Sequence, residues 1–167
     1  MCKLKKIFTE LSDVIDKAYK YVGIAFLVFL TAASFIQVIS RYVFNNSLSW
    51  TEELARYAFI WANMLGAAIA VKHGHHASVD LLPNKLHGKK RAVQQLLVTA
   101  LTTFGAGLLL VEGLKMTASI YATGQLSAAV RLPMYLIYMS VPVGGFGMII
   151  HCVTFLFEEI KNLKGGA

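Results

Sequence analysis

Apolar residues along the chain gather in four long runs separated by short polar segments. The runs cover about residues 21–44, 50–71, 92–121 and 133–157. Each has at least roughly the 20 residues that a helix needs to cross ~30 Å of hydrocarbon. Open β-structure would leave backbone groups unpaired in lipid, and the alternation typical of a transmembrane barrel is missing. The pattern predicts an all-α integral membrane bundle of four transmembrane helices.

The segment before the first run has a different pattern. Its apolar and charged positions fall on different sides of a helix, with Ile7, Leu11, Val14, Ile15 and Ala18 on one side and Glu10, Asp13, Asp16 and Lys17 mostly on the other. Such a helix lies in the membrane interface. Residues 1–20 are therefore expected to form a cytoplasmic or interfacial segment with a short amphipathic helix at residues 8–20. The first run would then be an uncleaved signal anchor.

Composition agrees with a membrane protein and sets its orientation. Apolar residues make up 56% of the chain, against roughly 45–50% in soluble domains. The net charge of +7 comes mainly from Lys and Arg before the first run, between the second and third, and after the fourth. Only Arg41, Arg56, Lys115 and Arg131 fall on the opposite side. By the positive-inside rule both termini face the cytoplasm, so the basic excess reports topology and not nucleic-acid binding.

Three charged residues stand at the start of the second run. Glu52, Glu53 and Arg56 precede residues 57–71, a stretch without formal charge. At 1.5 Å per residue that stretch is ~22 Å long, which is shorter than the hydrocarbon core. The helix must begin earlier, so the three charges lie at or just within the outer boundary. Glu52 and Arg56 are four residues apart and are expected to pair.

These charges continue into one face of the second helix. At 100° per residue, six positions fall within about 40° of one line: Glu52, Arg56, Phe59, Asn63, Gly66 and Ala70. Small residues permit close helix approach, and polar residues in lipid seek protein partners. The charged end therefore belongs to a packing face. Its partner is either another helix of this chain or a second protein.

Histidines raise the possibility of a bound group. His73, His75 and His76 follow the second run, and His151 lies near the same side of the fourth. Histidines on facing helices could ligate a haem, and zinc is a further alternative, although acidic and cysteine companions are not obvious. The simplest interpretation is an interfacial loop whose imidazoles meet water and lipid headgroups.

Other polar residues are assigned contact or structural roles: His76, Asp80, Glu112, Lys115 and Arg131. Asp80 would cap a short helix or pair with a loop lysine. Glu112 and Lys115, three residues apart toward the outer end of the third run, are expected to pair. The sequence offers no Ser-His-Asp set, phosphate loop or carboxylate dyad, so an enzyme is not expected.

A family resemblance follows from the order of several short motifs. They are Arg41-Tyr42-Val43-Phe44, Ser49-Trp50-Thr51-Glu52-Glu53-Leu54-Ala55-Arg56, Gly66-Ala67-Ala68, His73-Gly74-His75-His76-Ala77-Ser78-Val79-Asp80, Leu132-Pro133, Tyr138 and Pro142-Val143-Gly144. In this order they resemble the small permease subunit, of the DctQ or SiaQ type, of tripartite ATP-independent periplasmic (TRAP) transporters. The resemblance is dense from Arg41 to Asp80 and loose across the third run.

The resemblance implies a non-catalytic subunit in a bacterial inner membrane. In that family a large permease subunit binds substrate and sodium and moves like an elevator, while a periplasmic binding protein delivers a carboxylate such as a C4-dicarboxylate or sialic acid. This chain would be a static scaffold among lipids, with no cofactor and no sodium of its own. Assembly is assigned to Arg41, Trp50, Glu52, Glu53, Arg56, Asn63 and Gly66. A haem-binding anchor of a respiratory complex and a small homo-oligomeric channel remain as alternatives.

Overall fold

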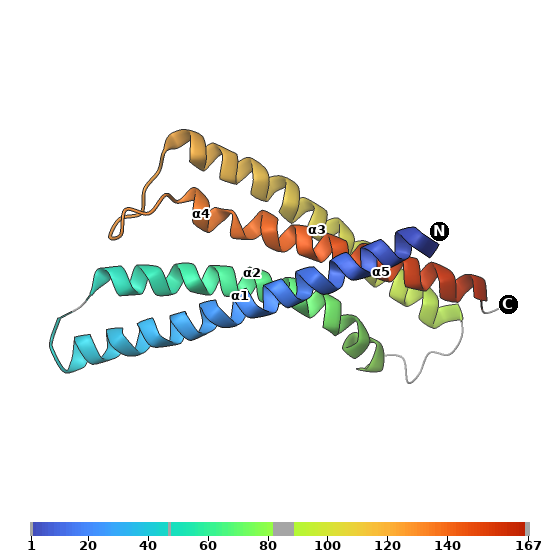
Figure 1. The fold of residues 1–167 in the computed structure, drawn as a ribbon, viewed down its shortest axis with the longest axis horizontal. Helices are drawn as coiled ribbons and strands as arrows, with labels where there is room; N and C mark the ends of the chain where they lie inside the picture. The colour runs from blue at the N-terminus through green and yellow to red at the C-terminus, as the bar shows by residue number, and fades with distance from the viewer. Residues whose placement is uncertain (1, 47, 82–88, 166–167) are drawn as a thin grey trace.

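The computed structural model describes residues 2–46, 48–81 and 89–165 and is helical almost throughout. Its elements are α1 (Cys2–Tyr42), α2 (Ser49–Leu81), α3 (Lys89–Thr123), α4 (Tyr135–Tyr138) and α5 (Ser140–Gly165). Both termini lie at one end of an elongated bundle, here called the terminal end, and the α1–α2 and α3–α4 connections lie at the other, the turn end (Figure 1).

Four segments are long and apolar enough to cross a membrane. They are Ile7–Tyr42, Ser49–His73, Leu96–Thr123 and Tyr135–Leu156. The predicted four-helix membrane protein is therefore confirmed as a fold. An even number of spans also accounts for both termini lying at the same end.

Helix α5 forms the centre of the bundle. In an 18-residue stretch of the span Tyr135–Leu156, which α5 forms together with α4, 56% of the residues are buried, against 11–17% in the corresponding stretches of the other three spans. Helix α5 packs on α1, α2 and α3. Glycines allow this close packing. A Cβ on Gly144 would lie 2.9 Å from the Met64 carbonyl oxygen of α2, and one on Gly145 would lie 3.0 Å from the Leu110 nitrogen of α3. The backbones therefore approach without intervening side chains.

The predicted boundary near residue 20 is absent, because α1 is one helix of 41 residues from Cys2 to Tyr42. The sequence offers no helix breaker between residues 8 and 20, so the helix continues. On this segment Ile7, Leu11 and Val14 are exposed, whereas Ser12 and Asp16 are buried against the bundle. Polar side chains can face inward here because α2 and α5 supply partners for them.

Two further boundaries differ from the prediction. Helix α2 runs on to Leu81, so His73, His75, His76 and Asp80 belong to this helix, not to a loop or a following helix cap. The fourth helix, predicted as one run over residues 133–157, is instead divided at Met139 into α4 and α5. Pro142 lies in the first turn of α5, where its missing N–H costs little.

Candidate functional site

Glu53 binds the loop between α3 and α4 through backbone hydrogen bonds. Its carboxylate accepts backbone N–H bonds from Ala128 (3.1 Å), Ala129 (2.8 Å) and Val130 (3.0 Å), and the Tyr57 hydroxyl donates a further bond. Consecutive N–H groups form a concave anion site, and bonds to an ionised acceptor are stronger than neutral ones. The structure thus gives Glu53 a partner within its own chain.

The neighbouring glutamate, Glu52, points elsewhere. It forms the predicted pair with Arg56 at 3.1 Å, with 59% of the Glu52 side chain and 65% of the Arg56 side chain exposed. Gln37 of α1 donates a weak 3.4 Å bond to its other oxygen. Exposed pairs of this kind contribute little to stability, so this pair remains available for an external contact.

Glu52 and Arg56 open an exposed line along α2, which we call the α2 face. All six of its members are exposed: Glu52, Arg56, Phe59, Asn63, Gly66 and Ala70. The Asn63 amide donates only to the carbonyl of Phe59 in its own helix, at 3.0 Å. A Cβ on Gly66 would meet nothing within 4 Å.

The opposite side of α2 makes the contacts inside the bundle. Its buried members include Ala58, Ala62, Leu65 and Ala68. Among the described residues, the weak bond from Gln37 of α1 to Glu52 is the contact that another helix makes with the polar groups of the α2 face, so the exposure of this face favours a partner outside the chain. A polar amide and small residues on the outside of a membrane span fit a protein neighbour better than lipid.

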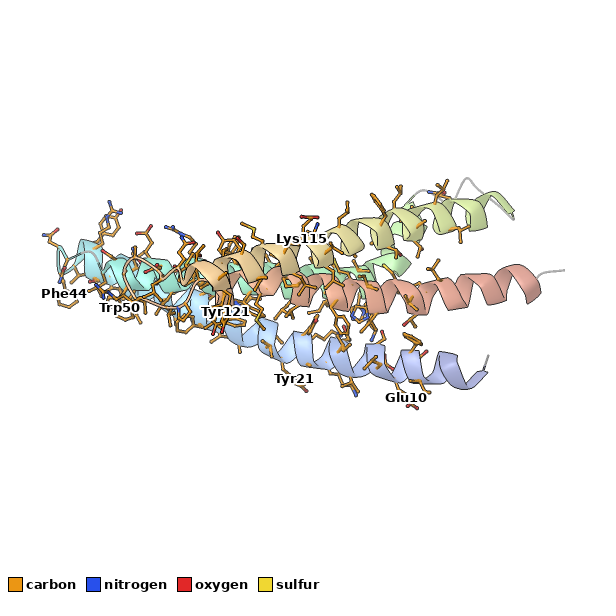
Figure 2. The ribbon with its side chains drawn as sticks, turned by 90° about the horizontal axis from the view of Figure 1, so that it is seen from above. Glu10, Tyr21, Phe44, Trp50, Lys115 and Tyr121 are labelled. Carbon is orange, nitrogen blue, oxygen red and sulfur yellow. The ribbon has the colours of Figure 1, made fainter. Side chains whose placement is uncertain are left out.

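The remaining residues assigned to assembly lie at the turn end. Arg41 is exposed in the last turn of α1, where a cation suits the negative end of the helix dipole. Trp50 is 48% exposed in the first turn of α2, a position typical of the aromatic belt. Figure 2 shows Trp50 and Phe44 together at this end of the molecule.

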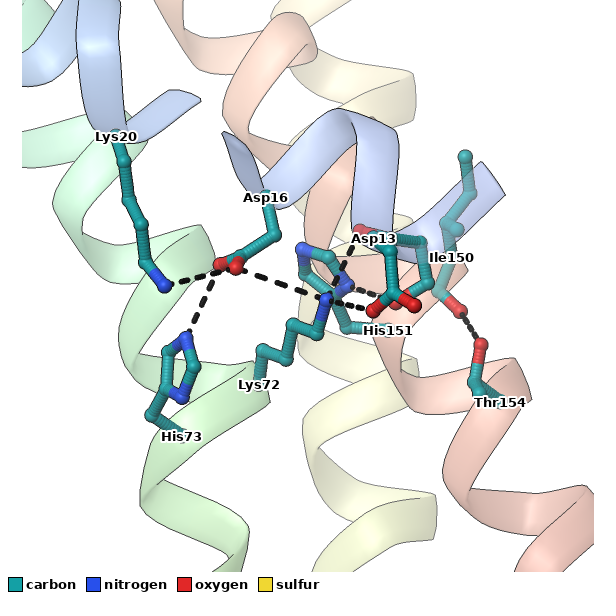
Figure 3. Close-up of polar contacts among 9 residues, drawn as sticks. Asp13, Asp16, Lys20, Lys72, His73, Ile150, His151 and Thr154 are labelled. Atoms are coloured by element: carbon teal, nitrogen blue, oxygen red, sulfur yellow. Dashed lines mark hydrogen bonds and ion pairs between the residues drawn. The ribbon is translucent and has the colours of Figure 1, made fainter. Parts of the chain in front are cut away.

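A polar cluster around the buried side chain of Asp16 joins α1, α2 and α5 toward the terminal end (Figure 3). Asp16 of α1 lies 2.9 Å from Lys20, 3.7 Å from Lys72 of α2 and 3.2 Å from His73, and its side chain is only 8% exposed. Lys72 also pairs with Asp13 at 2.7 Å. This set of contacts was missed in the sequence, where only the spacing of Asp16 and Lys20 along one helix gave a sign of it.

The two histidines whose side chains the structure describes, His73 and His151, bond to different residues. His73 Nε2 bonds Asp16, while His151 of α5 is buried and its Nδ1 lies 2.8 Å from the Ser12 hydroxyl. The side chains of His75, His76 and Asp80 lie outside the described residues. Among the side chains described, no group of three or more His, Cys, Asp or Glu could hold a metal ion.

Two predicted contact residues on α3 do pair. The ammonium of Lys115 lies 2.8 Å from a carboxylate oxygen of Glu112, and about two thirds of each side chain is exposed. Arg131 is exposed in the loop that Glu53 fastens, with a left-handed φ of 56°. Neither the pair nor Arg131 belongs to the α2 face.

The sequence matches the model of one protein family over residues 21–162. That family is described as tripartite ATP-independent periplasmic transporters, DctQ component. The matched region includes the α2 face, the α3 pair and all but the N-terminal part of α1.

Three relatives show the range of similar proteins. The C4-dicarboxylate TRAP transporter small permease protein DctQ of Rhodobacter capsulatus is 32% identical over 66% of this chain and 47% of its own length. The sialic acid TRAP transporter small permease protein SiaQ of Vibrio cholerae is 27% identical over 97% of this chain and 88% of its own. The chain thus matches about half the length of the first relative and most of the second.

A third relative is much longer than this chain. The isethionate TRAP transporter permease protein DctMQ of Oleidesulfovibrio alaskensis is 26% identical over 80% of this chain but only 21% of its own length. A segment similar to this chain is therefore one part of a larger polypeptide in that protein.

Proposed function

This chain belongs to the DctQ family of tripartite ATP-independent periplasmic transporter components, and we propose that it is the small membrane subunit of a sodium-coupled, binding-protein-dependent transporter. Its role is that of a static scaffold for a large permease subunit in the bacterial inner membrane. Substrate and sodium bind to that partner, and this chain is not an enzyme. The family match over residues 21–162 supports the assignment.

The scaffold proposal rests mainly on the exposure of the α2 face. It combines an exposed charge pair at the turn end with Asn63, Gly66 and Ala70 farther along the span. Small residues permit a neighbouring backbone to approach, and the amide offers an interhelical hydrogen bond. We therefore assign this face to the large subunit.

The long DctMQ relative supports a permanent partner. When two binding surfaces are parts of one chain, their association becomes intramolecular and its effective concentration high. If a small subunit is fused to a large one in that relative, this chain should match only the small part, and it matches about a fifth of the relative's length. We propose that this chain makes the same contact without the covalent link.

The substrate class follows from the relatives and not from any pocket in this chain. The small permease relatives named for C4-dicarboxylate and sialic acid favour a carboxylate, delivered by a periplasmic binding protein that approaches the turn end. Both termini then face the cytoplasm, as the distribution of Lys and Arg indicates.

Co-purification tests the proposal with a matched pair of variants. Asn63 and Thr31 are both exposed polar residues within a span, and each bonds a carbonyl one turn back in its own helix. We expect Asn63→Leu to weaken recovery of the co-expressed large permease protein at least fivefold, because it removes the outward amide. Thr31→Val on α1 is expected to leave recovery unchanged.

Substrate uptake by cells that carry both proteins gives a second readout. Uptake should fall together with recovery in Asn63→Leu and persist in Thr31→Val. Full uptake in cells that lack this chain altogether would refute the scaffold role. Uptake by this chain alone in liposomes would favour the channel alternative.

A further inference from the structure

The Glu112–Lys115 pair lies within the span Leu96–Thr123, 8 to 11 residues before the turn end of that span. Gly113 faces α5, where a Cβ would lie 2.9 Å from Pro142 Cδ, and Gly144, two residues farther along α5, faces Met64 of α2. Both α2 and α5 start at the turn end (Figure 1) and run in the same direction. Because Gly144 lies beside Met64, Pro142 lies level with about residue 62 of α2, and Gly113, which contacts Pro142, lies at the same level. That level is about 20 Å from Ser49 and about 16 Å from His73, near the middle of the span.

Lipid is a poor neighbour for this pair. Ionisable residues at mid-membrane depth are costly and almost always face protein or a water-filled cavity. Here the side chains of Glu112 and Lys115 are 65% and 66% exposed, so in the described chain they face outward. The pair is too deep for either side chain to reach an interface easily.

A groove of about 440 Å³ lies beside the pair. It is lined by Leu108, Leu109, Glu112 and Met116 of α3, with Tyr138 of α4 and Val141 of α5. On α5, Gly144 faces α2 and Gly145 faces α3. Around the helix axis, Val141 points about 60° from the direction of Gly144 and about 40° from that of Gly145, and so between them. The groove therefore lies between α3 and the α4–α5 segment, on the side of Val141 that is turned partly toward α2.

The pair and the α2 face turn to the same side of the molecule. Trp61 stacks on Phe26 of α1, and Leu65 faces Gly23 of α1, so the α2 face lies away from α1. Figure 2 shows Lys115 pointing away from the side that carries Tyr21 of α1. One partner can therefore cover both features.

We propose that this groove receives a transmembrane helix of the large permease subunit, with a neutral hydrogen-bonding side chain at mid-membrane depth bound to Glu112 and Lys115. This inference rests on the proposed function. One bond joins the two groups among the described residues, which leaves the second carboxylate oxygen and two ammonium hydrogens for a partner. Because the pair is neutral overall, an amide or hydroxyl complements it, whereas a single charge would be repelled by one member.

A double substitution tests the contact. Glu112→Leu with Lys115→Leu removes the pair while making α3 more apolar, so the isolated chain should insert and remain folded. We expect its affinity for the large permease protein in nanodiscs to fall at least tenfold. The control Thr31→Leu on α1 should bind as the wild type does.

Cross-linking identifies the occupant. A photoreactive residue at Leu108 should cross-link to the large permease protein, and one at Val28 on α1, 64% exposed, should not. Cross-links from Leu108 only to lipid or to a second copy of this chain would overturn the inference, as would unchanged affinity of the double variant. If Asn63→Leu weakens binding and the double variant does not, the proposed function stands and this inference fails. If the wild type does not bind the large protein, both fail.

Discussion

Glu52 and Glu53 are chemically identical neighbours with different roles. Glu53 accepts three backbone N–H bonds and one hydroxyl bond within the chain, whereas Glu52 pairs with Arg56 at the surface. The difference arises because successive helical residues point 100° apart. At this scale the structure separates a residue that shapes the chain from one that is free to contact a partner.

Replacement of Glu53 should loosen the α3–α4 loop. Hydrogen bonds to a charged group are stronger than neutral ones, so we expect Glu53→Ala to speed amide exchange at Ala128, Ala129 and Val130 by roughly tenfold or more. Hydrogen exchange measured by mass spectrometry checks this. Glu52→Ala is the control, and equal protection of the loop in both variants would contradict the assigned contacts.

Asp16 should matter far more than Asp13, although both contact Lys72. The Asp16 side chain is 8% exposed and Asp13 is 58% exposed. Removal of one member of a mostly buried pair such as Asp16 and Lys72 is strongly destabilising, whereas exposed pairs contribute about 0–1 kcal/mol. Unfolding in detergent should show a large loss for Asp16→Asn and a small one for Asp13→Asn. Similar losses in both would show that the cluster is not buried in the membrane protein.

At the scale of the element, hydrophobic runs and spacing predicted the four spans and the Glu52–Arg56 and Glu112–Lys115 pairs, since all of these depend on local sequence. The continuity of α1 was missed because the inward-facing polar residues Ser12 and Asp16 find partners on α5 and α2, in addition to Lys20 on α1 itself. The target of Glu53 was missed for the same reason, because 75 or more residues separate it from the amides that it binds. Contacts between residues so far apart in the chain leave no periodic pattern in the sequence from which they could be predicted.

Close packing of α5 predicts a contrast between two glycines. Gly144→Ala would place a Cβ 2.9 Å from the Met64 carbonyl oxygen, and such overpacking typically costs 1–3 kcal/mol. Gly66→Ala meets open space and gains helix propensity, so the isolated chain should be as stable or more stable. Thermal unfolding in nanodiscs measures both. A stable Gly144→Ala variant would mean that α2 and α5 are farther apart than described.

At the scale of the whole molecule, the bundle has two unlike sides. The outward side of α1 is apolar, with Val28 and Phe35 64% and 66% exposed, as expected of a surface that meets lipid. The side away from α1 carries the α2 face and the α3 pair, which together supply charge, an amide and open glycine surface. This asymmetry is the physical basis for a subunit that meets lipid on one side and a protein on the other.

The most direct test of that claim compares the lipid accessibility of the two sides before and after assembly. Spin labels at Phe59→Cys on the α2 face and Phe35→Cys on α1, in a variant without Cys2 and Cys152, report collisions with oxygen in the bilayer. On addition of the large permease protein, we predict that accessibility at position 59 falls severalfold and that position 35 is unchanged. Unchanged accessibility at position 59 in an assembled complex would contradict the account.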